Sequence, residues 1–268
     1  MVSRAAAASP TTWPLDIRLM NGVSALVFVL SALILLAAAV AWLVRAPWFP
    51  IRGITLEGDM ARNSVATIRA VVMPKLSGNF FAIDLKSARG AFETVPWVRT
   101  AVVRRVWPDR IAVRLEEHRA VAYWETETGD EQLVNAFGEV FLANLGDVED
   151  ELLPQLSGPR GSAAQVLQMW RELEPLVKRL DLSVQRLALS GRGSWRAELD
   201  NAAVIEMGRG TDAQVLDRTR RFIRTVPQVT GQFRNRFVYA DLRHPDGYAL
   251  RLQGVSTTGP VPPARKSP

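Results

Sequence analysis

The residue types that most often perform catalysis are sparse in this chain of 268 residues. It contains no cysteine, which excludes disulfides and thiolate metal sites. Its two histidines, His118 and His244, lie far apart in the sequence, and neither has a partner at metal-ligand spacing. We therefore expect no metal site, no bound cofactor and no catalytic residues.

Three further motifs resemble chemical sites, but each has a simpler interpretation. Glu116 and Glu117 could form a carboxylate pair for glycoside cleavage, yet adjacent residues on a strand point to opposite faces. Ser190-Gly-Arg-Gly193 and Gly208-Arg-Gly210 contain glycines but lack the spacing and the lysine of a phosphate-binding loop. They predict turns between strands, and we expect no small-molecule substrate.

The last predicted hairpin is the part of the chain best suited to binding. Its strands cover residues 237–242 and 248–252 and are joined over Pro245-Asp246-Gly247. The last strand of an open sheet exposes unpaired N–H and C=O groups, to which a segment of another protein could add as an extra strand. In the alternative interpretation, Tyr248 and Leu252 are core residues of an ordinary hairpin.

The composition indicates a folded core and a basic surface. Hydrophobic residues make up 48% of the chain, and its formal net charge is +6. A positive charge favours anionic neighbours such as lipid head groups, nucleic acid or an acidic protein. The charges are scattered and mostly interleaved with acids, so an ordinary soluble basic surface explains them equally well.

Residues 22–44 contain no charged side chain, and as a helix they would span a hydrocarbon layer of roughly 30 Å. Trp42 and Trp48 sit where interfacial aromatic residues are common. A buried core helix and a cleaved signal peptide are the alternatives, but the segment is long for both. We expect a single uncleaved transmembrane helix. The positive charges on its two sides are close to balanced and leave its orientation open.

Residues 50–118 predict a compact α+β unit. The order is a strand at 51–58, a helix from Asn63 or Ser64 to about residue 73, a helix at 84–93, and strands at 98–106 and 111–117. Such a β-α-α-β-β unit packs two helices on one face of a three-stranded sheet.

Residues 120–253 predict a second, mixed and β-rich domain with an open-edged sheet. Helices are expected at 162–178 and 212–226, with a hairpin at 133–141 and strands at 184–189, 195–199 and 203–207 before the last hairpin. The first 14 residues and the tail from 254 to 268 have the composition of disordered segments.

Several motifs together resemble the bacterial cell-division family FtsQ/DivIB, over about residues 20–253. Residues 49–58 resemble the start of a POTRA domain. The other landmarks are Asn79-Phe-Phe-Ala-Ile-Asp84, Val95-Pro-Trp-Val98, Trp107-Pro-Asp109, Glu117-His-Arg-Ala-Val-Ala-Tyr-Trp124, Leu133-Val-Asn-Ala-Phe-Gly-Glu-Val-Phe141, Ser194-Trp195, Gly208-Arg-Gly210 and Val238-Tyr-Ala-Asp-Leu-Arg243. Their order matches the FtsQ branch of Gram-negative bacteria.

The resemblance implies a non-enzymatic scaffold of the divisome that binds FtsB and FtsL and contacts other divisome proteins at the division septum. It implies a single-pass, type II protein of the inner membrane: a cytoplasmic tail (1–21), the transmembrane helix (22–44), then a POTRA domain (49–119) and a β domain (120–253) in the periplasm. Nucleic acid is not expected as a partner there.

The resemblance also implies a binding site on the last strand, where relatives dock FtsB. The matching positions in this chain are Arg192, His244, Asp246, Gly247, Tyr248, Ala249, Leu250, Arg251 and Leu252. Tyr248 and Leu252 depart from the family pattern, which has a small residue after the turn and an aromatic residue near the end of the strand.

Two other functions stay open. A POTRA subunit that passes chains to a transporter would predict repeated POTRA units or a membrane barrel. An anchored periplasmic enzyme acting on the cell wall would need a nucleophile or an acid–base pair in a cleft. A basic hairpin face is also expected at Arg104, Arg105, Arg110 and Arg114, either meeting acidic partners or paired with Glu116 and Glu117.

Overall fold

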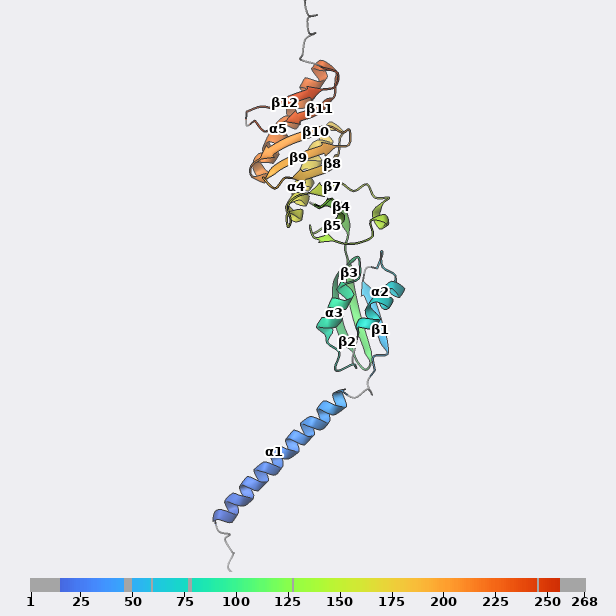
Figure 1. Ribbon diagram of the computed structural model, residues 1–268, viewed down its shortest axis with the longest axis vertical. Helices are drawn as coiled ribbons and strands as arrows, with labels where there is room; N and C mark the ends of the chain where they lie inside the picture. The colour runs from blue at the N-terminus through green and yellow to red at the C-terminus, as the bar shows by residue number, and fades with distance from the viewer. Residues whose placement is uncertain are drawn as a thin grey trace, which may run out of the picture. The chain divides into compact units, whose positions relative to one another are not determined.

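The computed structural model describes residues 15–45, 50–58, 60–76, 79–126, 128–244 and 246–255. The first 14 residues and residues 256–268, for which disorder is expected, lie outside this range. The chain forms two compact units, one from residues up to 57, 69–92 and 101–114, and one from 58–68, 93–100 and 115 onward. Figure 1 labels the elements.

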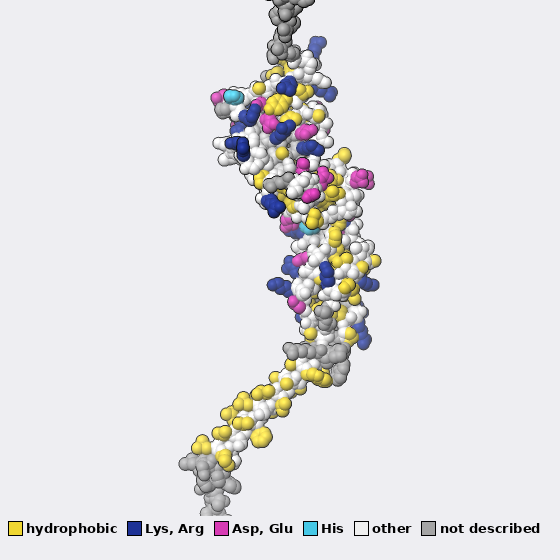
Figure 2. Space-filling view, in the orientation of Figure 1, with side chains coloured by type: hydrophobic (Ala, Val, Ile, Leu, Met, Phe, Trp, Pro, Cys, Tyr) yellow, Lys and Arg dark blue, Asp and Glu magenta, His cyan; other side chains and the backbone are white. Residues whose placement is uncertain are grey.

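The N-terminal helix α1 covers Leu15–Arg45 and confirms the predicted apolar helix. Its segment Leu19–Leu43 is long and apolar enough to cross a membrane, and none of the span's most apolar stretch is buried in the protein. Figure 2 shows hydrophobic side chains along the helix. Exposed apolar side chains on every side of a helix are unfavourable in water, so this helix is suited to a lipid surrounding.

The predicted order strand, helix, helix, strand, strand is confirmed. The elements are β1 (Gly53–Gly58), α2 (Val65–Val72), a 3₁₀ turn η1 (Met73–Lys75), α3 (Leu85–Glu93), β2 (Val98–Val106) and β3 (Arg110–Glu117). The three strands lie in the order β1-β3-β2. The last strand in sequence is therefore central, and β1 and β2 are edges.

The predicted helix starts are also confirmed. The Ser64 hydroxyl accepts a hydrogen bond from the Thr67 amide at 3.0 Å, and the Asp84 carboxylate accepts one from the Lys86 amide at 2.9 Å. Each side chain satisfies an amide that the first helical turn leaves without a partner. Pro74 lies in η1, directly after α2.

Of the four arginines expected on the basic hairpin face, Arg104, Arg105 and Arg114 have partners other than Glu116 and Glu117. Arg104 and Arg114 both reach Glu57, at 3.2 and 3.8 Å. Arg105 instead donates to the carbonyls of three residues before α3, and thus lies on the helix-covered face because strand side chains alternate. Those carbonyls belong to Phe80, Phe81 and Ile83.

The second domain is built on a nine-stranded mixed sheet, in the order β12-β11-β10-β9-β8-β7-β4-β5-β6. The strands are β4 (Ala120–Glu125), β5 (Glu131–Asn135), β6 (Val140–Phe141), β7 (Gln155–Ser157), β8 (Val184–Leu189), β9 (Ser194–Leu199), β10 (Val204–Arg209), β11 (Phe237–Asp241) and β12 (Ala249–Leu252). Neighbours β4/β7, β7/β8 and β10/β11 are parallel, and the other pairs are antiparallel.

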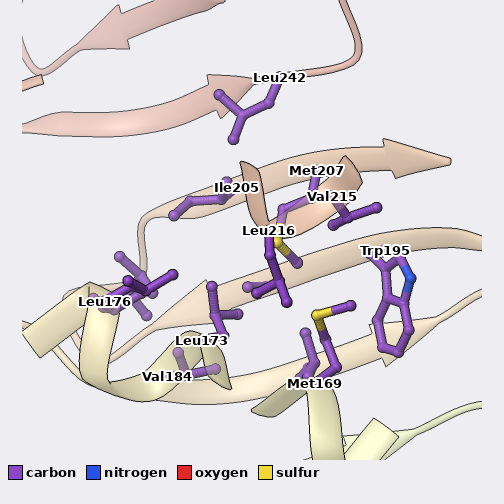
Figure 3. Packing of buried hydrophobic residues seen from close by; sticks show 14 of the residues in the cluster. Met169, Leu173, Leu176, Val184, Trp195, Ile205, Met207, Val215, Leu216 and Leu242 are labelled. Carbon is purple, nitrogen blue, oxygen red and sulfur yellow. The ribbon is translucent and has the colours of Figure 1, made fainter. Parts of the chain in front are cut away.

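Two helices, α4 (Ala163–Val177) and α5 (Asp212–Phe233), pack on the sheet and enclose its main core. Figure 3 shows Met169 and Leu173 of α4 and Leu216 of α5 directed toward Trp195 and Ile205 of the sheet. Two short 3₁₀ turns, η2 (Leu145–Val148) and η3 (Lys178–Leu180), complete the domain. The core therefore fixes the strands that lead to the open end of the sheet.

The predicted helix at 212–226 is too short and begins with a different cap. The helix α5 continues to Phe233 with Pro227 inside it, and Thr211 rather than Asp212 is its N-cap. Thr211 and Gln214 form a capping box, in which each side chain accepts from the backbone amide of the other residue. Packing of α5 against β10 and α4 outweighs the single hydrogen bond that Pro227 removes.

Candidate protein-interaction edge

The strand β12 is an edge of the nine-stranded sheet. It pairs antiparallel with β11, from Asp241↔Ala249 to Phe237↔Leu252. Within the described ranges of the chain, no strand pairs with its other side. The last strand thus has one row of backbone groups that pairs with no described strand. One of these groups, the Leu252 carbonyl, accepts a local hydrogen bond from the Val255 amide at 3.4 Å.

The register indicates which backbone groups point outward. The Gln253 amide donates to the Arg236 carbonyl at 2.9 Å, so Gln253 directs its backbone groups toward β11. Residues of an antiparallel strand alternate in this respect. The same alternation places the N–H and C=O of Leu252 and Leu250 on the free side of β12. The bulge near Phe237 lies on β11 and leaves this alternation along β12 intact.

The side chains of Tyr248, Leu250 and Leu252 face the core. Leu252 is buried, and the other two pack partly buried against the same cluster. The Tyr248 ring meets Phe222 edge-on at 5.1 Å, and its hydroxyl lies 2.7 Å from the Thr225 hydroxyl. The structure therefore combines both interpretations of the hairpin, since Tyr248 and Leu252 join the core while the strand stays an edge.

The other residues predicted for this site are exposed. They are His244, Asp246, Gly247, Ala249 and Arg251. The Arg251 guanidinium lies over the ring of its cross-strand neighbour Tyr239, 5.9 Å from the ring centre. A strand added at β12 would meet Ala249 and Arg251 on one face of the sheet and mainly backbone along the edge.

Arg192 lies at the same end of the sheet but not beside β12. It is in the turn before β9, whose first residue Ser194 pairs with Arg209 at the end of β10. Because β10 and β11 are parallel, this end also carries the connection from β11 to β12. Three strand spacings separate β9 from β12, or about 14 Å. A partner that contacts both needs a second segment besides the added strand.

A basic groove, missed by the sequence analysis, lies beside the predicted site. A cavity of about 300 Å³ is bordered by Arg218, Arg221, Arg224, Thr225, Leu242, His244, Asp246, Gly247 and Tyr248. The three arginines recur at every third position of α5, a spacing that places them near one face of a helix. That spacing indicates a basic face of the helix from the sequence, but not the connection that completes the groove.

Arg218 is fixed in this groove by backbone carbonyls. Its Nη2 donates to the carbonyls of Met207 at 2.9 Å and Arg209 at 2.7 Å. Its Nε is buried and has no hydrogen-bond partner among the described residues. The positive charge of Arg218, next to the β11–β12 connection, favours an acidic group in a bound segment.

A close ion pair holds the end of β11. The Arg243 guanidinium donates to both carboxylate oxygens of Asp241, with Nε at 2.8 and 3.1 Å. Hydrogen bonds from the Arg243 side chain lower the pKa of Asp241 below its usual range. Asp241 therefore stays ionised and anchors the segment that leads to His244.

His118 has packing and hydrogen-bond contacts within the second domain. Its ring stacks on Phe141 with centres 4.0 Å apart, and its Nδ1 lies 2.9 Å from the Asn135 side-chain amide. Burial lowers the pKa of His118. Among the described residues, no three His, Asp or Glu side chains gather where they could hold a metal ion.

The fold and the open edge define a class: proteins with an apolar N-terminal helix, a POTRA domain and a β-rich domain. The family model "POTRA domain, FtsQ-type" matches residues 49–118. The model "Cell division protein FtsQ/DivIB, C-terminal" matches residues 122–243. This second match ends before β12, so it carries no argument about that strand.

Curated relatives extend the likeness to almost the whole chain. A cell division protein FtsQ of Thiomonas arsenitoxydans is 42% identical and covers 97% of this chain and 96% of its own length. Those of Burkholderia pseudomallei and Bordetella pertussis are 39% and 36% identical, over 90% and 94% of this chain and 94% and 95% of their own lengths. The chain belongs to the FtsQ/DivIB family of cell-division proteins. This supports a role in the divisome, with interactions between division proteins and a membrane anchor.

Proposed function

We propose that this protein is a non-enzymatic scaffold of the divisome that captures FtsB, together with FtsL, by β-strand addition at β12. The observation that carries the proposal is the free side of β12, where the amides of Leu250 and Leu252 and the carbonyl of Leu250 are available for pairing. Through this contact the scaffold links early and late steps of septal assembly.

The proposed site consists of β12, its preceding connection and Arg192. The added strand pairs with the edge, and Ala249 and Arg251 select its side chains. Arg192 contacts a second segment of the partner, because β9 lies three strand positions away from β12 in the sheet. The groove at Arg218 favours acidic residues in the bound chain.

We further propose a type II topology in the inner membrane. The tail before the span lies in the cytoplasm, and both folded domains lie in the periplasm, concentrated at the septum. The single candidate span among the described residues, Leu19–Leu43, supports a fold that lies entirely on one side. The test is a reporter fused after Pro268. A reporter that works only in the periplasm should be active, and a reporter that works only in the cytoplasm should be silent. The opposite activities would refute this topology.

The proposed strand addition at β12 is tested by a substitution that removes one outward N–H. We expect Leu250→Pro to abolish capture of FtsB in a pull-down, because proline removes an N–H from the free side of β12. By the alternation of the strand, that N–H is not used in pairing with β11. The fold should persist. The variant should therefore have the same circular dichroism spectrum and the same pattern of proteolytic fragments as the parent chain.

Leu250→Val is the matched control for this experiment. It also shortens the partly buried side chain, at a cost of about 1 kcal/mol, but keeps the amide. The control should capture FtsB like the parent chain. Equal capture by a folded Leu250→Pro variant would exclude strand addition at this edge. Normal division after depletion of the protein would exclude the scaffold role itself.

A further inference from the structure

The turn between β2 and β3 exposes an aromatic side chain that the proposed scaffold role does not use. Trp107 is 80% exposed, and the nearby valines Val102 and Val106 on the edge strand β2 are 61% and 36% exposed. An indole in this position contributes nothing to the core. Trp107 is amphipathic, with a large apolar ring and one N–H donor, as is typical of residues at membrane–water interfaces.

Arginines surround this turn. The Arg52 guanidinium is 76% exposed and lies 3.9 Å from Asp109, and Arg110 is exposed next to it. Further along the sheet, Arg104 and Arg114 share the single carboxylate Glu57. At the turn itself, Arg52 and Arg110 face the single carboxylate of Asp109, which leaves a positive balance beside Trp107.

The chain itself holds this turn close to the bilayer. The amide of Arg52 donates to the Asp109 carbonyl at 3.0 Å, so the turn is fastened to the start of β1. Arg52 is only seven positions after Arg45, the last residue of α1. A fully extended chain of that length spans at most about 25 Å. The turn therefore stays within that distance of the end of the membrane helix, on whichever side the domain lies.

We propose that the β2–β3 turn is a membrane-contact element, in which Trp107 enters the interfacial layer and Arg52 and Arg110 bind the phosphates of anionic lipids. Each basic residue near an anionic surface contributes about 1 kcal/mol. Such an affinity is weak for a free domain. Because α1 inserts in the same bilayer, the contact is intramolecular, and its effective concentration is raised to about the millimolar range.

The absence of cysteine allows a direct test on the full chain. A single cysteine at Val106, labelled with an environment-sensitive fluorophore, reports on the turn after reconstitution into vesicles. In vesicles of phosphatidylglycerol and phosphatidylcholine, doxyl-labelled lipids should quench this label. We expect at least a twofold loss of quenching on Trp107→Ala, in 1 M salt, and in pure phosphatidylcholine. Phe233→Ala is the matched control, since Phe233 is an exposed aromatic residue of the other unit and should change nothing.

Two results would overturn the membrane contact. One is a label that the doxyl lipids leave unquenched in both kinds of vesicle. The other is quenching that does not change with Trp107→Ala, salt or lipid charge, which would reflect proximity imposed by the tether alone. If the doxyl lipids do not quench the label and its fluorescence shows shielding from water only after a purified division protein is added, the turn would be assigned to a protein partner. None of these outcomes depends on β12, so they test this proposal separately from the capture of FtsB.

Discussion

At the scale of single residues, Glu139 in the turn between β5 and β6 is held by two neighbouring side chains. It accepts hydrogen bonds from Arg99 Nε at 2.8 Å and from the Asn135 side chain at 2.6 Å. These bonds lower the pKa of Glu139 from 4.5 to about 2, and the bond from Arg99 has the larger effect. The contacts fasten the turn after β5 to the start of β2, within one compact unit.

The lowered pKa of Glu139 predicts a loss of stability in acid. The unfolded chain binds the proton more tightly, so the contribution is complete above about pH 4.5 and disappears as the pH falls toward 2. Because the Glu139 side chain is 48% exposed, we expect about 1 kcal/mol at most. Glu139→Gln should lower the free energy of unfolding at pH 7 and have little effect at pH 2. Urea titration in detergent measures both values.

The control for this prediction is Glu149→Gln, which changes an exposed carboxylate that has no partner among the residues described above. This control should leave the difference in the free energy of unfolding between pH 7 and pH 2 the same as in the parent chain. An identical difference for Glu139→Gln and the parent chain would show that the contacts with Arg99 and Asn135 contribute no stability.

At the scale of elements, the edge strand depends on α5 more than on its own pairing. The strand β12 has four residues, and an isolated hairpin of this size is marginal in water. The buried ring of Phe222 on α5 contacts both Phe237 of β11, at 5.5 Å, and Tyr248, at 5.1 Å. This aromatic contact fixes the strand that the partner is proposed to meet.

Substitutions in this contact should separate packing from hydrogen bonding. Phe222→Ala removes a fully buried ring and should cost about 3–5 kcal/mol in the free energy of unfolding. Tyr248→Phe removes only the bond to Thr225 and should cost about 1 kcal/mol. Thermal unfolding measures both, and a pull-down should find FtsB captured normally by Tyr248→Phe. A larger loss of stability for Tyr248→Phe than for Phe222→Ala would contradict this assignment.

Local sequence signals predicted most of the helices and strands, but they did not predict the pairing of strands that are far apart in the sequence. The alternation of residues 111–116 and the turn residues Pro108-Asp109 placed the first hairpin, and the turn at Phe137-Gly138 placed the second, because both pairings are local. The three residues of β7 are too few to show a period, although this strand joins β4 to β8. The groove combines α5 with a connection about twenty residues later, and no local pattern reports such a meeting.

At the scale of the whole molecule, the protein has two separate proposed contact sites. The strand β12 is proposed to bind FtsB, and the β2–β3 turn is proposed to meet the lipid surface next to α1. The two sites share no residues and belong to different compact units. Trp107→Ala should therefore leave FtsB capture unchanged, and Leu250→Pro should leave lipid quenching unchanged.

Amide hydrogen exchange of residues 249–252, with and without FtsB, tests the central claim most directly. In the free protein, the outward amides of Leu250 and Leu252 should exchange fast, as expected for groups without a partner. Addition of FtsB should slow exchange at these two amides more than at Ala249 and Arg251, which already face β11. Unchanged exchange across residues 249–252 in a sample where FtsB is fully bound would contradict the proposed strand addition.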